Sequence, residues 1–129
     1  MFKGRGRLVF DYRNGSKVFE PWWAMVLCDR EIQRYYAWHL LKRGRKADMA
    51  SPWGTHISVI KGEEPKYKEK WLKYQRVWVE FEYTGNIRYD NDKQSHAWID
   101  VYSQQLSDIR VDLGLFAKTR YHLTIGRLL

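Results

Sequence analysis

The chain has 129 residues, of which 23 are basic and 15 acidic, so its formal net charge is +8. This length suits one domain with a single core, and no apolar run approaches the length of a membrane-spanning helix. A charge of +8 points to an anionic partner, but many basic proteins bind no specific anion, so charge alone leaves both possibilities open.

Strands are predicted where apolar and polar residues alternate, and helices where apolar residues recur every three or four positions. In chain order, the pattern predicts strands at 7–12 and 22–28, a helix at 30–43, a strand at 55–60, a short helix at 66–74, strands at 76–83 and 97–102, a short helix at 106–113 and a strand at 120–125. Asp29 and Gly44 are suitable boundaries for the first helix. We therefore predict an α+β fold, one domain over residues 1–129, with two related lobes of helix-backed antiparallel sheet and a central cleft.

Two of the predicted strands carry the same four-residue pattern. Residues 56–59 are His-Ile-Ser-Val, and residues 122–125 are His-Leu-Thr-Ile. Side chains alternate between the faces of a strand, so each His shares a face with its hydroxyl residue while the apolar residues share the other. If only one such strand were present, the simplest interpretation would be a half-buried histidine with satisfied hydrogen bonds. Two such strands, facing each other, would place two imidazoles and two hydroxyls around one pocket. These groups are suited to general acid–base catalysis of phosphodiester cleavage.

The paired His-x-Ser/Thr motif resembles the 2H phosphoesterase superfamily. The longer stretch 53–60, followed by 62–63 and taken with 22–24 and the helix around 35–38, is similar to its compact phage-encoded branch. That branch includes the anti-CBASS nucleases, which degrade the host's cyclic oligonucleotide signals. The resemblance implies a pseudo-twofold arrangement of the two lobes and a phosphodiesterase that needs no metal and no cofactor.

The expected catalytic residues are His56, Ser58, His122 and Thr124. One neutral imidazole would take a proton from the nucleophile, and the other, charged, would protonate the leaving oxygen. The two hydroxyls would donate hydrogen bonds to the non-bridging phosphate oxygens. Arg120 lies two residues before His122, on the same strand face, and is either a phosphate contact or a solvated strand end. The sequence leaves open which histidine is the base. It also leaves open whether water or a ribose 2′-hydroxyl attacks.

Three aromatic residues are candidates for stacking on a base, namely Tyr12, Trp78 and Trp98. Each could equally cover a backing helix. The basic run 42–46 could contact phosphates, although a solvated helix end is the simpler interpretation. Residues 90–92 lack the continuation of a calcium loop and are expected to form a turn, and two histidines with one distant cysteine make a poor transition-metal set.

The leading hypothesis is a metal-independent phosphodiesterase of cyclic oligonucleotides, used by a phage against host immunity. We expect it in the host cytoplasm, since one cysteine excludes an internal disulfide and residues 1–5 lack the apolar stretch of a signal peptide. No membrane and no obligate protein partner are expected. The alternatives are the same chemistry on RNA ends or 2′,3′-cyclic phosphates, and a non-catalytic nucleotide-binding or RNA-binding module. An enclosed cleft would favour a cyclic substrate, and an open basic groove would favour RNA.

Overall fold

The computed structural model describes residues 1–11, 21–51, 54–90 and 95–129. Its elements are β1 (Phe2–Phe10), β2 (Trp23–Cys28), α1 (Arg30–Lys42), β3 (Ala47–Asp48), β4 (His56–Lys61), the 3-10 turn η1 (Lys68–Lys70), β5 (Trp78–Tyr89), β6 (His96–Tyr102), α2 (Gln104–Asp112) and β7 (Arg120–Leu128). Neither α-helix in this part of the chain is long and apolar enough to cross a membrane.

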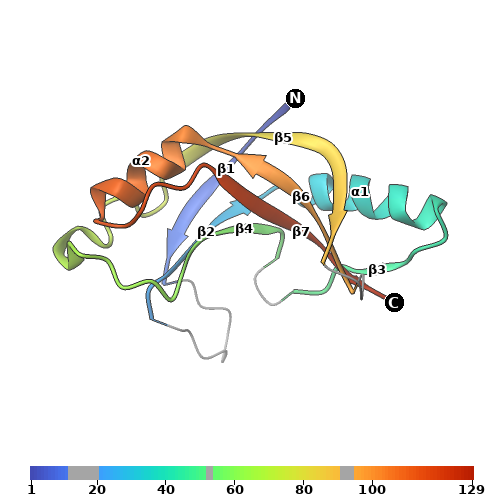
Figure 1. Ribbon diagram of the computed structural model, residues 1–129, viewed down its shortest axis with the longest axis horizontal. Helices are drawn as coiled ribbons and strands as arrows, with labels where there is room; N and C mark the ends of the chain where they lie inside the picture. The colour runs from blue at the N-terminus through green and yellow to red at the C-terminus, as the bar shows by residue number, and fades with distance from the viewer. Residues whose placement is uncertain (12–20, 52–53, 91–94) are drawn as a thin grey trace.

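The strands form one antiparallel sheet that closes on itself. Their order is β3-β7-β4-β2-β1-β5-β6, and β6 pairs back with β7, so that six strands complete a barrel (Figure 1). Strand β7 makes the closure, because it pairs with β6 along most of its length and with β4 where Ile57 meets Leu123. The short strand β3 adds to the distal end of β7, where Asp48 pairs with Arg127.

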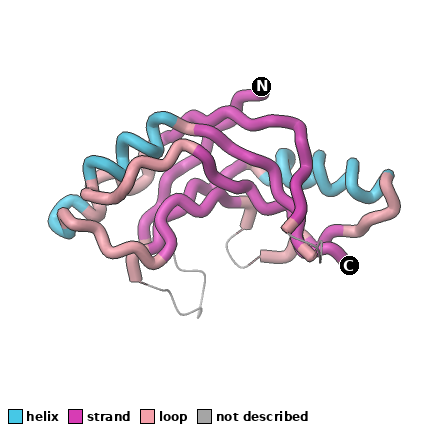
Figure 2. The backbone as a smooth tube through the Cα atoms, in the orientation of Figure 1, coloured by secondary structure: helices cyan, strands magenta, loops and turns pink. Residues whose placement is uncertain are grey.

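The predicted α+β fold with two helix-backed lobes is therefore wrong. The structure is mostly sheet, and its two short helices lie at opposite ends of the strand body (Figures 1 and 2). One buried cluster joins strands and helices, and it includes Leu8, Val26, Ile57, Ile99 and Leu123 from the strands, Tyr36 and Leu40 from α1, and Leu106 and Ile109 from α2. Alternation predicts each strand by itself, but closure depends on which distant strands pair, and local patterns do not encode this.

The first predicted helix is confirmed, as α1. The Asp29 carboxylate accepts a hydrogen bond from the Glu31 backbone N–H at 2.9 Å, which satisfies one of the free donors at the helix start. The predicted helix at 66–74 is wrong, because only the 3-10 turn η1 forms there. In this segment Trp71 is buried edge-to-face on Phe10, and Tyr74 donates its hydroxyl hydrogen to Asp112. Tertiary contacts thus override the helical spacing.

The described residues contain two strand–helix–strand units, β6–α2–β7 and β2–α1–β4, the latter with the two-residue strand β3 between α1 and β4. In each unit the two strands are antiparallel neighbours and the second strand carries a His motif. Gln33 of α1 connects the units, since it accepts a hydrogen bond from the Thr55 hydroxyl and donates one to the Ile125 carbonyl. The two motif strands are consequently adjacent in the barrel rather than facing each other across a cleft between lobes.

Candidate active site

The two His motifs form one outward-facing surface on β4 and β7. Ile57 and Leu123 pair across the two strands, and both are fully buried in the core. Their neighbours in each strand point the opposite way, as alternation predicts. Because the strands are antiparallel, His56 lies beside Thr124, and Ser58 lies beside His122. Four side chains from distant parts of the chain thus meet as two crossed His–hydroxyl pairs.

His56 is oriented by the turn that precedes its strand. Its Nδ1 lies 2.8 Å from the Gly54 carbonyl oxygen, which accepts a hydrogen bond, so Nδ1 carries a proton. Gly54 has φ +73°, a left-handed conformation that glycine adopts without strain. The other ring nitrogen, Nε2, is left to exchange a proton with a substrate.

His122 has different surroundings, supplied by β6. Its ring stacks on Trp98 with centroids 4.7 Å apart, and its Nε2 lies 3.7 Å from Asp100 Oδ1. Partial burial lowers the pKa of His122 below its usual range; the Asp100 charge opposes this effect, while Arg120 adds to it. These surroundings therefore favour the neutral form of His122.

Asp100 is a site residue that the sequence analysis missed. It is buried, and its Oδ2 accepts a hydrogen bond from Arg88 Nη1 at 3.0 Å. Its Oδ1, which faces His122, has no hydrogen-bond partner among the described residues. A buried acceptor without a donor is costly, so this oxygen is ready for an imidazolium N–H. The available signal was alternation, since Asp100 falls between buried Ile99 and Val101, on the same side as Trp98.

The candidate binding residues are dispersed. Arg120 is exposed, pairs with Tyr102 and lies on the outward face with His122. Trp98 is in the site, but it packs against the ring of His122. Trp78 is outside it, since by strand order the β1–β5 pair is opposite the β4–β7 pair. Tyr12 lies outside the described residues.

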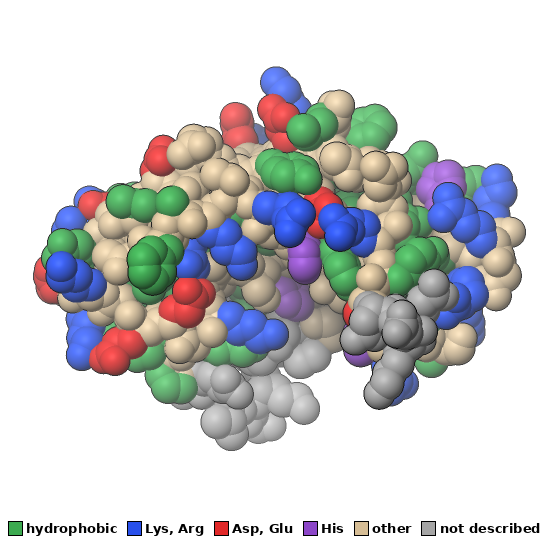
Figure 3. Space-filling view, viewed as in Figure 1, with side chains coloured by type: hydrophobic (Ala, Val, Ile, Leu, Met, Phe, Trp, Pro, Cys, Tyr) green, Lys and Arg blue, Asp and Glu red, His purple; other side chains and the backbone are tan. Residues whose placement is uncertain are grey.

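A hollow of about 440 Å³ adjoins the quartet on the side of His56 and Thr124. Its other lining residues include Asp48, His96 and Arg127, none of which the sequence analysis singled out. His96 and Arg127 are cross-strand partners on β6 and β7, which places them further along the same outward surface. Figure 3 shows histidine side chains near the middle of this view of the molecule, with Lys and Arg side chains close by. Among the described residues, no group of three or more His, Cys, Asp or Glu could hold a metal ion.

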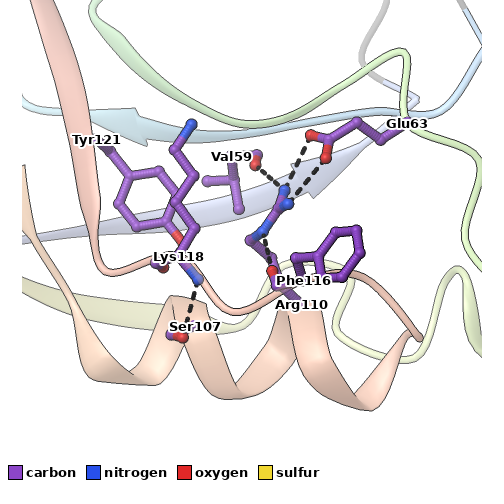
Figure 4. Close-up of polar contacts among 7 residues, drawn as sticks. All are labelled: Val59, Glu63, Ser107, Arg110, Phe116, Lys118 and Tyr121. Carbon is purple, nitrogen blue, oxygen red and sulfur yellow. Dashed lines mark hydrogen bonds and ion pairs between the residues drawn. The ribbon is translucent and has the colours of Figure 1, made fainter.

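A buried arginine of α2 connects β4 to the segment that leads into β7 (Figure 4). Arg110 of α2 donates to the Val59 carbonyl at 2.8 Å, within β4, and to the Phe116 carbonyl at 3.0 Å, in the segment that leads to β7. Its guanidinium also makes a two-pronged pair with the Glu63 carboxylate, at 2.8 and 3.0 Å. This pair holds the pKa of Glu63 below its usual range. Arg110 therefore links the residue after Ser58 to the approach of His122.

Comparisons with protein-family models, with curated proteins and with solved structures find no match to this chain. The geometry of the site is therefore the basis on which a function is inferred.

Proposed function

We propose that the protein is a metal-independent phosphodiesterase that uses His56 and His122 as its acid–base pair. One observation carries the proposal: the pairing of Ile57 with Leu123 puts both imidazoles and both hydroxyls on one accessible surface. A phosphodiester placed there would have a proton acceptor and a proton donor within reach of the same phosphorus.

His122 is the proposed base, because its lowered pKa favours the neutral form, which can accept a proton. It takes the proton of the attacking hydroxyl on Nδ1, since Nε2 faces Asp100. The Nε2–H of the resulting imidazolium then donates to Asp100 Oδ1, which compensates the new charge. The attacking oxygen forms the bond to phosphorus as the bond to the leaving oxygen breaks.

His56 is the proposed acid. Its Nδ1–H stays on the Gly54 carbonyl, while Nε2 delivers a proton to the leaving oxygen. Ser58 and Thr124 donate hydrogen bonds to the non-bridging oxygens and so stabilise the charge that develops there. Arg120, on the same face, is the proposed further contact to phosphate.

The motif resemblance to 2H phosphoesterases supports cyclic oligonucleotides as the substrate. We accordingly propose a phage enzyme that removes host alarm signals in the host cytoplasm. A second candidate is RNA with a terminal or 2′,3′-cyclic phosphate. It is favoured by the position of the quartet on an outward face of the barrel, where the side chain of His122 is 51% exposed.

The deciding experiment is a digest in EDTA of 3′,5′-cyclic di- and trinucleotides, a 2′,3′-cyclic mononucleotide and a short RNA, with products separated by chromatography. The His56→Ala/His122→Ala double variant is the control. Cleavage of cyclic oligonucleotides alone, lost in the control, supports the counter-defence role, and cleavage of RNA alone supports RNA processing. Binding without cleavage of any substrate would overturn the catalytic proposal and favour a nucleotide-binding module.

A further inference from the structure

The outer side of α1 carries an exposed surface that neither the fold nor the catalytic quartet uses. Tyr35, Trp38 and Leu41 are 55%, 51% and 58% exposed, although all three are large and apolar. Residues 30–46 contain one acidic residue, Glu31, and six basic residues, namely Arg30, Arg34, Lys42, Arg43, Arg45 and Lys46. We call these residues together the α1 surface.

The helix geometry separates this surface from the core. Tyr36 and Leu40 are buried against the barrel, whereas positions 35, 38 and 41 turn to the opposite side. Lys42 lies one turn after Trp38, with its Nζ 4.6 Å from the ring centroid. Glu31 pairs with Arg34 at 3.0 Å, and the basic residues of segment 30–46 outnumber its one acidic residue.

The α1 surface leads toward the candidate active site. Lys46 directly precedes β3, and its carbonyl accepts a hydrogen bond from the Leu129 N–H at 2.9 Å, beside the end of β7. Asp48, two residues further on, lines the hollow that also contains His56 and Thr124. The segment that follows the basic end of α1 therefore reaches one side of this hollow.

We propose that the α1 surface binds a linear single strand of nucleic acid. The Lys and Arg side chains contact successive phosphates, and Trp38 and Tyr35 provide rings on which bases stack. The composition favours this ligand over an anionic bilayer, because six cations accompany only three apolar side chains and the inner face of the helix is already packed on the barrel. This binding activity does not depend on the catalytic proposal.

The test measures fluorescence anisotropy of a labelled single-stranded RNA of about 12 nucleotides, a length within the usual range of single-strand sites. All proteins carry His56→Ala/His122→Ala, so that strand cleavage does not interfere. The two test variants add Trp38→Ala or Lys42→Glu/Lys46→Glu. One matched control adds Trp78→Ala, which removes a ring that is also half exposed and covered by a cation. The other adds Lys66→Glu/Lys68→Glu, which makes the same charge change in a segment at the opposite end of the molecule from α1 (Figure 1).

We expect each test variant to weaken RNA binding by at least about tenfold, while the controls retain it. Lys42→Glu/Lys46→Glu should also reduce the salt dependence, by about 1.4 in the slope of log K against log salt, because two phosphate contacts are lost. Equal losses in the controls would overturn the proposal in favour of a general charge effect. Absence of RNA binding would overturn it too, as would Trp38-dependent binding to phosphatidylserine vesicles alone or Trp38-dependent dimerisation seen by ultracentrifugation.

Discussion

The strand–helix–strand units that end in β4 and in β7 carry the same motif, but they hold their histidines differently. His56 is positioned by a backbone carbonyl from its own turn, at Gly54. His122 is positioned by side chains of the neighbouring strand, with Trp98 against its ring and Asp100 beside its Nε2. Equivalent local sequences thus acquire different surroundings from their tertiary neighbours, and the acid–base pair that we propose uses this difference.

Substitution of the two histidines should have the largest effect on the rate, and it tests whether the two units have distinct roles. His56→Ala and His122→Ala should each lower kcat/KM by at least about a hundredfold, the usual scale for loss of a general acid or base. His122→Ala should also remove the fall in rate at acidic pH, because the protonation of His122 then no longer limits the rate. Full pH–rate profiles of both variants measure this. Near-wild-type rates in both variants would contradict the mechanism.

Removal of the Arg110 contacts, which join the two units, should lower the free energy of unfolding more than any other substitution considered. Arg110→Ala leaves the Glu63 carboxylate and two carbonyls without their donor, so we expect the free energy of unfolding to fall by about 3 kcal/mol. Urea unfolding measures the change. Arg110→Lys is the matched control, since it keeps the charge but loses the two-pronged geometry, and it should recover only part of the stability. Unchanged unfolding of Arg110→Ala would show that these contacts are dispensable.

Removal of the two hydroxyl groups tests whether the β4 and β7 units contribute equally to binding of the phosphate. Ser58→Ala and Thr124→Ala should each lower kcat by about tenfold to a hundredfold, because each removes one donor to a non-bridging oxygen. Both residues lie on the outward surface, so thermal stability should hardly change. Ser58→Thr and Thr124→Ser keep the hydroxyl and should retain most activity. A loss of folding in the alanine variants would instead assign these residues to the structure.

Asp100→Asn should affect only the β7 unit. The Asp100 charge raises the pKa of His122, so its removal lowers that pKa further and moves the acidic limb of the kcat/KM profile to lower pH. The imidazolium also loses its charged acceptor, and kcat should fall about tenfold. Asp90→Asn, which removes a carboxylate that pairs with His96 on the same strand, is the control and should leave the limb in place. A shift to higher pH in Asp100→Asn would refute the assignment of His122 as the base.

The smallest expected effect is confined to the β4 unit. A Cβ on Gly54 would meet nothing within 4 Å, but φ +73° disfavours other residues, so Gly54→Ala should cost about 1–2 kcal/mol of stability. The turn should also relax and carry its carbonyl away from His56, lowering kcat severalfold while the acidic limb set by His122 stays unchanged. Calorimetry and a pH–rate profile measure both effects. A shift of the acidic limb of the pH–rate profile in Gly54→Ala would contradict the assignment of that limb to His122 alone.

The sequence by itself determined which residues share a strand face. Alternation over 56–59 and 122–125 predicts buried Ile57 and Leu123 with His and hydroxyl residues outward, and the structure agrees. It also predicts α1 with its Asp29 cap, because spacing and capping act within a few residues. Such features are local, and a single segment carries all the information they need.

The tertiary structure alone decided which strands meet and what surrounds each histidine. The barrel closure through β7, the approach of Asp100 to His122 and the Arg110 contacts all join segments far apart in the chain. The failure of the predicted helix at 66–74 and the position of Trp78 away from the site have the same origin. Packing energy summed over many distant contacts exceeds local preference there, so no pattern within one segment could have shown the outcome.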